Sequence, residues 1–327
     1  MVEDEKIEAL RDLFKGIQKI HLDIMEETAR HKMDEIGISV EHFNNWLEMI
    51  LDQKKYTGEE IGNSVSAIFL FQLGEELQRT IYSLLSGGYM DVLRALRSVF
   101  ESVVKAHFLD KWLDSEIVKR GMAKQGASIQ LKLEILSLLD EIGDIKSERA
   151  FLNRGHKDVI REVVIREAVD EFFKPFPENE HYKKLKIFYV EFISEYKERF
   201  RVFGGKEGLI SRLPEDIFSK SDKNDLNNLY RSLSKYSHLS GSVLDSFLDD
   251  PSQVFTPGFN EKLFDKCIQL LTSVMDIFIG IIYLHFPRLE VTEWLSKSVQ
   301  DLQMPLSQKI IERTKNDRLN NENGYIE

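Results

Sequence analysis

The sequence predicts an all-α protein, a multi-helix bundle with long antiparallel helical hairpins. The 327 residues include seven prolines, and the first is Pro175, so more than half of the chain lacks the strongest helix breaker. Apolar residues in that stretch recur at spacings of three and four, the period of one helix face. Alternating runs typical of strands are scarce. The β-branched run Val163-Val164-Ile165 lies inside a helical pattern with charges on both sides.

The N-terminal region predicts two helices in succession. The first covers residues 1–33 and the second residues 40–53, with Ser39 as the N-cap of the second. One side of the first helix is apolar, and we expect it to face the core. That side is formed by Ile7, Leu10, Leu13, Phe14, Ile17, Ile20 and Ile24.

Two glycines then separate a pair of strongly patterned helices. Apolar spacing predicts a helix over residues 61–85 that ends at Ser86-Gly87-Gly88, and a second one over residues 89–113. Glycine adopts the left-handed conformation that stops a helix, and we place the positive φ at Gly88. A connection this short predicts an antiparallel pair. The inward residues of the second helix are Leu93, Leu96, Val99, Phe100, Val103, Val104 and Phe108.

The remaining pattern predicts a single helical domain over residues 1–302, followed by a C-terminal helix and frayed tail over 303–327. We assign the core to residues 61–113 and 223–286, and an additional helical lobe to 115–205. Further helices are expected at 128–142, 157–173, 180–202, 223–240, 260–286 and, weakly, 291–302. Segment 203–214, with three glycines, is expected to be a flexible connection, and 250–258 a loop.

Charge and composition restrict the partners. A net charge of −11 disfavours broad attraction to DNA or to an anionic membrane. The only cysteine, Cys267, cannot form an intramolecular disulfide, which fits a reducing compartment. The N-terminus shows no secretory signal, and the most apolar stretch, 277–286, is half of what a membrane span needs. We therefore expect a cytoplasmic protein that does not bind membranes.

Motifs for cofactors and metals are missing. The chain has no glycine-rich phosphate loop, no His-Glu-x-x-His and no Cys-x-x-Cys. Only Glu178 and His181 have the Glu-x-x-His spacing of di-iron bundles, which need two such pairs. Cys267 falls on an apolar face and is expected to be buried rather than nucleophilic. We expect no metal and no cofactor.

A charged flank follows the predicted helix at 89–113. Its members are Arg94, Arg97, Glu101 and Lys105, spaced three, four and four. One interpretation is a solvated flank with pairs between neighbouring turns. The other is that Arg97 and Glu101 lie against a second helix as a buried pair that fixes the packing.

The most polar helix face lies between residues 229 and 241. Arg231 and His238 are seven residues apart, so they advance about 700°, within about 20° of two full turns, and project from one face. Tyr230, Ser234 and Ser237 flank that face. Gly241 is expected to end the helix, which places His238 in its last turn, where the helix dipole favours the imidazolium form.

This arrangement resembles the Arg-x(4–6)-His signature of the HEPN superfamily. The run from Gly87 to Glu101, followed by 230–238, is also similar to a group of uncharacterised prokaryotic helical proteins. The resemblance implies a HEPN-like core and a dimer whose two motifs face each other. It also implies the setting of a prokaryotic defence or toxin-like system. Two features differ from the signature: Ser232 follows the arginine, and the six intervening residues are at its long end.

Three interpretations of the function follow. The leading one is a helical interaction or regulatory module whose partner is a protein or a second copy of the chain. The alternative is a metal-independent RNase. In that enzyme His238 would transfer the proton, Arg231 would neutralise the phosphate, and Tyr230 or Ser234 would position it. The third is a pocket for a small ligand between helices, for which the sequence has no residue signature. If the motif is not catalytic, His238 only caps its helix and Arg231 pairs with a carboxylate.

Overall fold

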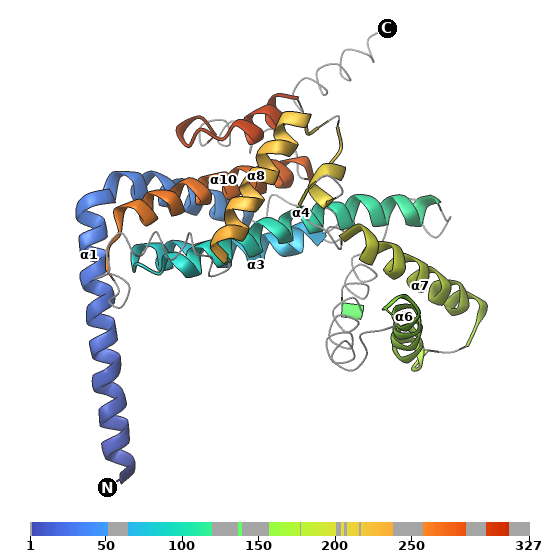
Figure 1. Ribbon diagram of the computed structural model, residues 1–327, viewed down its shortest axis with the longest axis horizontal. Helices are drawn as coiled ribbons and strands as arrows, with labels where there is room; N and C mark the ends of the chain where they lie inside the picture. The colour runs from blue at the N-terminus through green and yellow to red at the C-terminus, as the bar shows by residue number, and fades with distance from the viewer. Residues whose placement is uncertain are drawn as a thin grey trace. The chain divides into compact units, whose positions relative to one another are not determined.

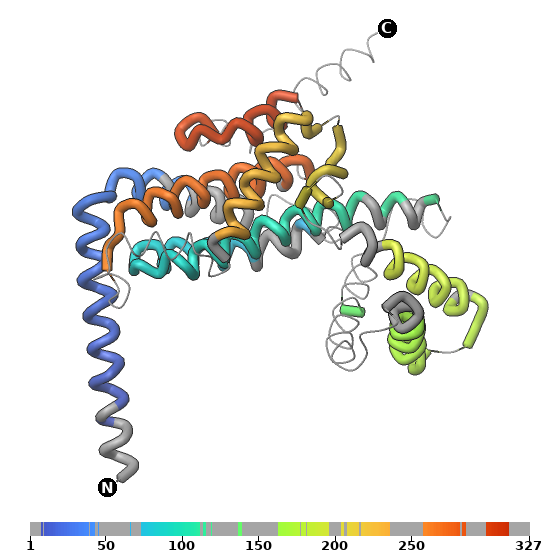
Figure 2. Tube along the Cα trace, in the orientation of Figure 1, coloured from blue at the N-terminus to red at the C-terminus, as the bar shows by residue number. Residues whose placement is uncertain are grey.

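The computed structural model describes most of the chain (Figures 1 and 2). The described residues are 2–51, 65–119, 137–138, 157–176, 178–200, 204–205, 208–215, 217–237, 258–285 and 299–313. No strand occurs among them, and the helices contain more than half of the chain, so the all-α prediction is confirmed. Several predicted features lie outside these ranges. They are His238, Gly241, the tail from Lys315 and the predicted helix at 128–142, of which only residues 137–138 are described.

The chain divides into two compact units. Unit 1 comprises Met1–Glu60, Ser66–Val104 and Pro214–Glu327, and unit 2 comprises Ile61–Val65 and Lys105–Leu213. Unit 1 holds helices α1, α3, α8, α10 and the first half of α4, and unit 2 holds α6 and α7. The single domain predicted over 1–302 stays a prediction.

Helix α1 covers Val2–Leu51 and is interrupted at one residue only within its described length. Lys32 has non-helical dihedral angles, with φ −135° and ψ 19°. The end predicted for the first helix, residue 33, lies one residue from this interruption. The start predicted for the second helix, with Ser39 as its N-cap, is wrong, because α1 continues through Ser39.

Helix α3 (Val65–Leu85) ends in the predicted glycine turn and α4 (Tyr89–Lys119) follows at once. Gly87 N–H donates to Leu84 O at 3.3 Å and Gly88 N–H to Ser83 O at 2.7 Å, the paired bonds of a Schellman motif. The left-handed residue is Gly87, with φ +78°, and not Gly88 as predicted. Gly88 instead accepts from the N–H groups of Asp91 and Val92, and so begins α4.

Side-chain caps determine where α8 (Lys220–Ser237) and α10 (Glu261–His285) begin. Ser219 N–H donates to Asp222 Oδ2 at 2.7 Å and Asp222 N–H donates to Ser219 Oγ at 3.3 Å, a reciprocal capping box. This box starts α8 three residues before the predicted position. Asn260 caps α10, since Leu263 N–H donates to Asn260 Oδ1 at 3.0 Å.

Helix α10 supplies the core of unit 1. Its buried residues include Phe264, Val274, Ile277 and Phe278. Cys267 is buried with them, as predicted, and burial raises the pKa of its thiol to about 12. Among the described residues, α10 is the one helix long and apolar enough to cross a membrane by length and composition. In its most apolar 18-residue window 71% is buried within the structure. The apolar stretch predicted over 277–286 is thus part of a longer apolar helix, and whether that helix contacts a membrane stays a prediction.

A buried carboxylate attaches a short C-terminal helix, residues 305–313, to α10. Asp276 accepts from the N–H groups of Leu306 at 3.0 Å and Ser307 at 2.7 Å, which occupies donors that a helix start leaves unpaired. Lys309 pairs with Asp222 at the start of α8. A Cβ at Gly280 would lie 2.9 Å from Ile310 Cδ1, so a side chain at this position would require the end of the Ile310 side chain to move.

In unit 2, α6 (Lys157–Phe173) has its predicted bounds and contacts α7 (Glu180–Phe200). Aromatic rings fill their junction, with Phe173 and Tyr189 edge-to-face at 5.2 Å. Lys186 Nζ lies 2.7 Å from Asp170 Oδ1 across the same pair. The short 3-10 helix η2 (Leu209–Arg212) buries Leu209 and Ile210. The interpretation of 203–214 as flexible is therefore wrong for this part of the segment.

Gly87→Ala should lower the free energy of unfolding by more than about 1 kcal/mol, because a side chain strains the left-handed conformation. The added Cβ would also lie 3.2 Å from Gly258 O. Gly37→Ala is the matched control, since Gly37 lies within α1 with no atom within 4 Å of a Cβ. That control should be neutral or gain up to about 1 kcal/mol. Urea denaturation measures both, and equal curves for Gly87→Ala and the parent would contradict the turn assignment.

Candidate functional site

The described part of the predicted motif lies on α8. Leu226 and Leu233 are buried, while Arg231 is exposed and Ser234 is half-buried. Within the residues that the structure describes, Arg231 forms no ion pair. A purely structural role predicts a carboxylate partner there, whereas a guanidinium facing solvent can bind an anion. His238 lies outside the described residues, so the structure brings together only three of the four predicted site residues, all on one helix.

Tyr230 connects α8 to the charged flank of α4. The Arg97 guanidinium carbon lies 5.7 Å from the centre of the Tyr230 ring, and the Phe100 ring stacks on Tyr230 at 6.5 Å. Arg97 Nε donates to Glu101 Oε1 at 2.9 Å, and these two side chains are 25% and 22% exposed. Partial burial by itself lowers the pKa of Arg97, but Glu101 and Tyr230 raise it above its usual value, so Arg97 stays charged.

The two interpretations of the charged flank therefore each describe part of it. Arg97 lies against Tyr230 of α8, as the second interpretation predicts, but the Arg97–Glu101 pair is half-buried rather than buried. Arg94 pairs with Asp91 on the exposed side of α4 at 3.1 Å, as the first one predicts. The α4–α8 contact thus holds Tyr230 in place one residue before Arg231.

A second feature, the arm, is the part of α1 formed by residues 8–22. In Figure 1 this part of the helix, in blue, runs on beyond the other helices of unit 1. Five large apolar side chains form a stripe along it and are 42–61% exposed. These residues of the stripe are Leu10, Leu13, Phe14, Ile17 and Ile20. The expectation that this face packs in the core is wrong for these five residues, whereas Ile24 of the predicted set is buried.

The arm joins the rest of unit 1 near Ile24. The Ile24 Cγ2 atom lies 3.2 Å from the Cβ position at Gly87, so the helix end of α3 presses against α1 there. One turn later Thr28 Oγ1 donates to Leu85 O at 3.2 Å. His31 then stacks on Phe259 with ring centres 5.4 Å apart.

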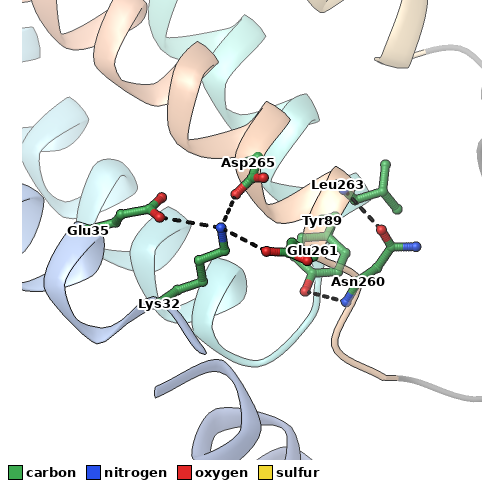
Figure 3. Close-up of polar contacts among 7 residues, drawn as sticks. All are labelled: Lys32, Glu35, Tyr89, Asn260, Glu261, Leu263 and Asp265. Carbon is green, nitrogen blue, oxygen red and sulfur yellow. Dashed lines mark hydrogen bonds and ion pairs between the residues drawn. The ribbon is translucent and has the colours of Figure 1, made fainter. Parts of the chain in front are cut away.

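Lys32, at the bend of α1, is surrounded by three carboxylates (Figure 3). Its Nζ lies 2.7 Å from Asp265 Oδ1, 3.2 Å from Glu261 Oε1 and 3.3 Å from Glu35 Oε1. The side chain is only 9% exposed. The hydrogen bond to Asp265 is the main reason that the pKa of Lys32 rises above its usual value, so the group stays an ammonium and cannot act as a base.

The same junction includes Tyr89, the first residue of α4 (Figure 3). The N–H of Asn260 donates to the Tyr89 hydroxyl at 3.1 Å, and burial raises the pKa of Tyr89 to about 12. The start of α10 is therefore held by α1 and α4 together. The geometry is that of an anchor for the base of the arm rather than of a reaction centre.

Sequence comparison assigns the chain to a family without giving it an activity. Residues 67–255, more than half of the chain, match the family of unknown function DUF5677. No curated protein and no solved structure matches the chain. The matched region includes the α4–α8 contact and the Arg231 motif, whereas the arm and Lys32 precede it. In the described residues, no group of three or more His, Cys, Asp or Glu side chains could hold a metal ion.

Lys32→Met should lower the melting temperature, because three carboxylates then face one another without the ammonium. In an Asp265→Asn background the same substitution should lower it less, which a double-mutant cycle measures as coupling. Lys15→Met is the control, because its ion pair with Asp12 is solvent-exposed and should contribute little. Additive effects of the Lys32 and Asp265 substitutions would contradict the anchor.

Proposed function

The chain belongs to the family of unknown function DUF5677, and we propose that it is a helical interaction module that binds its partner through the stripe of the arm. The observation that supports this proposal is the exposure of Leu10, Leu13, Phe14, Ile17 and Ile20 on one side of a helix. Contiguous exposed apolar surface on soluble proteins marks interaction sites. Fully burying an exposed side chain of this kind contributes about 1.5–3 kcal/mol, and covering these half-exposed ones contributes correspondingly less.

The position of the arm supports the same proposal. Its neighbours on the other side of the helix are also exposed, so within unit 1 the arm is a helix largely surrounded by solvent. Short helices without packing contacts are marginal in water, and most of their stability comes from a covered apolar face. A partner that covers the stripe would therefore stabilise the arm and bind at the same time.

A photo-cross-linking amino acid placed at Leu13 tests this proposal in extracts of the source cells. We expect one saturable protein adduct at Leu13 and none above background at Leu22. Leu22 is the matched control because it lies nine residues from Leu13, on the opposite face, and is equally exposed at 59%. Equal labelling at the two positions would exclude the stripe as the binding surface.

A metal-independent RNase is the second candidate, and the exposure of Arg231 favours it. We propose the RNase, together with a HEPN-like core of antiparallel hairpins, because the Arg231–His238 motif resembles the HEPN signature. Arg231 would neutralise the scissile phosphate and His238 would transfer the proton. The contact of Tyr230 with Arg97 and Phe100 would keep the motif helix rigid next to the substrate.

Cleavage of single-stranded RNA in EDTA tests this candidate, because the proton transfer needs no metal. Arg231→Ala and His238→Ala should each abolish cleavage. Arg231→Ala should leave the melting temperature within a few degrees, since an exposed side chain without an ion pair in the described structure contributes little. Lys235→Ala, at an exposed position one turn later, is the control and should retain activity. Intact RNA with the parent protein would end the nuclease proposal.

A further inference from the structure

We infer that the outer face of α8 binds the phosphodiester backbone of a single-stranded nucleic acid. The outer face consists of five exposed residues, Lys220, Asn224, Asn228, Arg231 and Lys235. The inference goes beyond the arm, and only Arg231 is shared with the RNase candidate. Three properties of the outer face lead to it: the alignment of its side chains, their hydrogen-bonding groups, and the lack of acidic and apolar residues among them.

The five side chains lie in one row along α8. Successive members are four, four, three and four residues apart, so at about 100° per residue their directions stay within about 80° of one another. The buried Leu226 and Leu233 are on the opposite side of the helix. At a rise of about 1.5 Å per residue, the row is about 22 Å long with a side chain every 4.5–6 Å or so. An extended ligand with charged groups at regular intervals matches such a row.

Every side chain in this row carries N–H donors. Lys220, Arg231 and Lys235 are cationic, and the amides of Asn224 and Asn228 add neutral donors. Lys220 and Arg231 form no ion pair within the residues that the structure describes, so neither charge is taken up by a described carboxylate. Lysine, arginine and asparagine side chains are among the groups that contact phosphate oxygens in nucleic-acid complexes. The outer face is therefore suited to an anion with several oxygens.

Within α8, acidic residues are missing from the outer side, although the chain has 55 of them against 44 basic ones. The positions that flank the row are occupied by Ser221, Lys223, Asn227, Ser232 and Ser234. The two acids of α8, Asp222 and Asp225, lie about 100° or more from the centre of the row. Asp222 is in addition paired with Lys309, and Glu215 pairs with Lys223 at the edge of the face at 3.7 Å.

The net charge of −11 acts only weakly on this contact. It disfavours broad attraction to a polyanion, but exposed charges act over about 8 Å at physiological salt, so the cations in the row dominate the field at the outer face. A strand whose phosphates are neutralised there releases its counterions, and this release supplies most of the affinity of sequence-independent binding.

The composition of the outer face favours a nucleic acid over a protein partner. The core of a protein interface is enriched in aromatic residues and depleted of charged ones. The outer face has no aromatic and no aliphatic residue. Because its donors form one row, they follow one phosphate backbone and not the two strands of a duplex.

Fluorescence anisotropy of a labelled oligo(dT) with the full chain tests the inference, since DNA lacks the 2′-hydroxyl on which an RNase of this kind would act. Combining Lys220→Gln with Arg231→Gln removes two cations from the row, and combining Asn224→Asp with Asn228→Asp places two acids in it. Each double variant should weaken binding roughly tenfold or more. The first should also lower the slope of log K against log salt by about 1.4, which is about 0.7 for each lost phosphate contact.

A third double variant, Lys19→Gln with Lys184→Gln, is the matched control. It changes the net charge by the same two units, and both lysines are exposed on other helices, α1 and α7. It should bind like the parent, with the same salt dependence. Melting temperatures close to that of the parent check that all three variants fold. Equal weakening by the control and by the outer-face variants would show a general effect of net charge and overturn the inference.

Two competitors test the chemistry of the ligand. Unlabelled oligo(U) should displace oligo(dT) at similar concentrations, because the phosphate contacts are the same in RNA and DNA. A failure of either oligonucleotide to bind would overturn the assignment to the phosphates. Poly-glutamate that displaces oligo(dT) as effectively would identify any acidic chain as a ligand, and it would overturn the assignment to a nucleic acid.

The outcomes also separate this inference from the RNase candidate. A parent that binds oligo(dT) and leaves oligo(U) intact supports the inference and ends the nuclease proposal. A parent that cleaves RNA, yet binds oligo(dT) equally well after the Lys220, Asn224 and Asn228 substitutions, overturns the inference and leaves the nuclease standing.

Discussion

Unit 1 depends on the contacts made where α10 begins. Residues 31–35, 87–89 and 258–265, far apart in the sequence, meet there. The Lys32 ammonium offsets the repulsion among Glu35, Glu261 and Asp265, and the Tyr89 hydroxyl accepts the N–H of Asn260. Because Gly87 lies against both Gly258 and Ile24, the turn between α3 and α4 has no room for a side chain. The ion pairs of Lys32, the cap at Asn260 and the left-handed turn at Gly87 thus all meet at the start of α10.

The sequence predicted those helix bounds that depend on residues close to the end of the helix. The bounds of α6 agree with the prediction, and the glycines correctly ended α3. Assigning the positive φ to one of two adjacent glycines requires the hydrogen-bond pattern, which the sequence does not contain. The end of the first helix was predicted within one residue of the bend at Lys32, but the ion pairs of Lys32 with two carboxylates of α10 could not be predicted, because these lie more than 220 residues away. The early start of α8 was readable, since Ser219 and Asp222 have the capping-box spacing.

For the candidate site, the sequence predicted some of the residues but not the contacts between them. Spacing alone placed Arg97 beside Glu101 and singled out Tyr230, but it could not show that the two helices bring Tyr230 under Arg97. The apolar face of the arm was recognised and its partner was misjudged. An amphipathic pattern says that a face will be covered, and not whether the covering surface belongs to the same molecule. Because the stripe is exposed in the structure, we interpret it as a proposed contact surface and not as part of the core.

The separation of the arm from the core also bears on how this protein can change over time. Substitutions in cores are constrained because most of them weaken folding, whereas positions with few tertiary contacts lie at the low-stability end of a structure. Residues 8–22 precede the junction at Ile24, Thr28 and Lys32, so their replacement leaves the anchored body intact. The binding specificity proposed for the arm can therefore diverge without the loss of fold that usually accompanies a new interface, and the arm lies outside the region that matches the family.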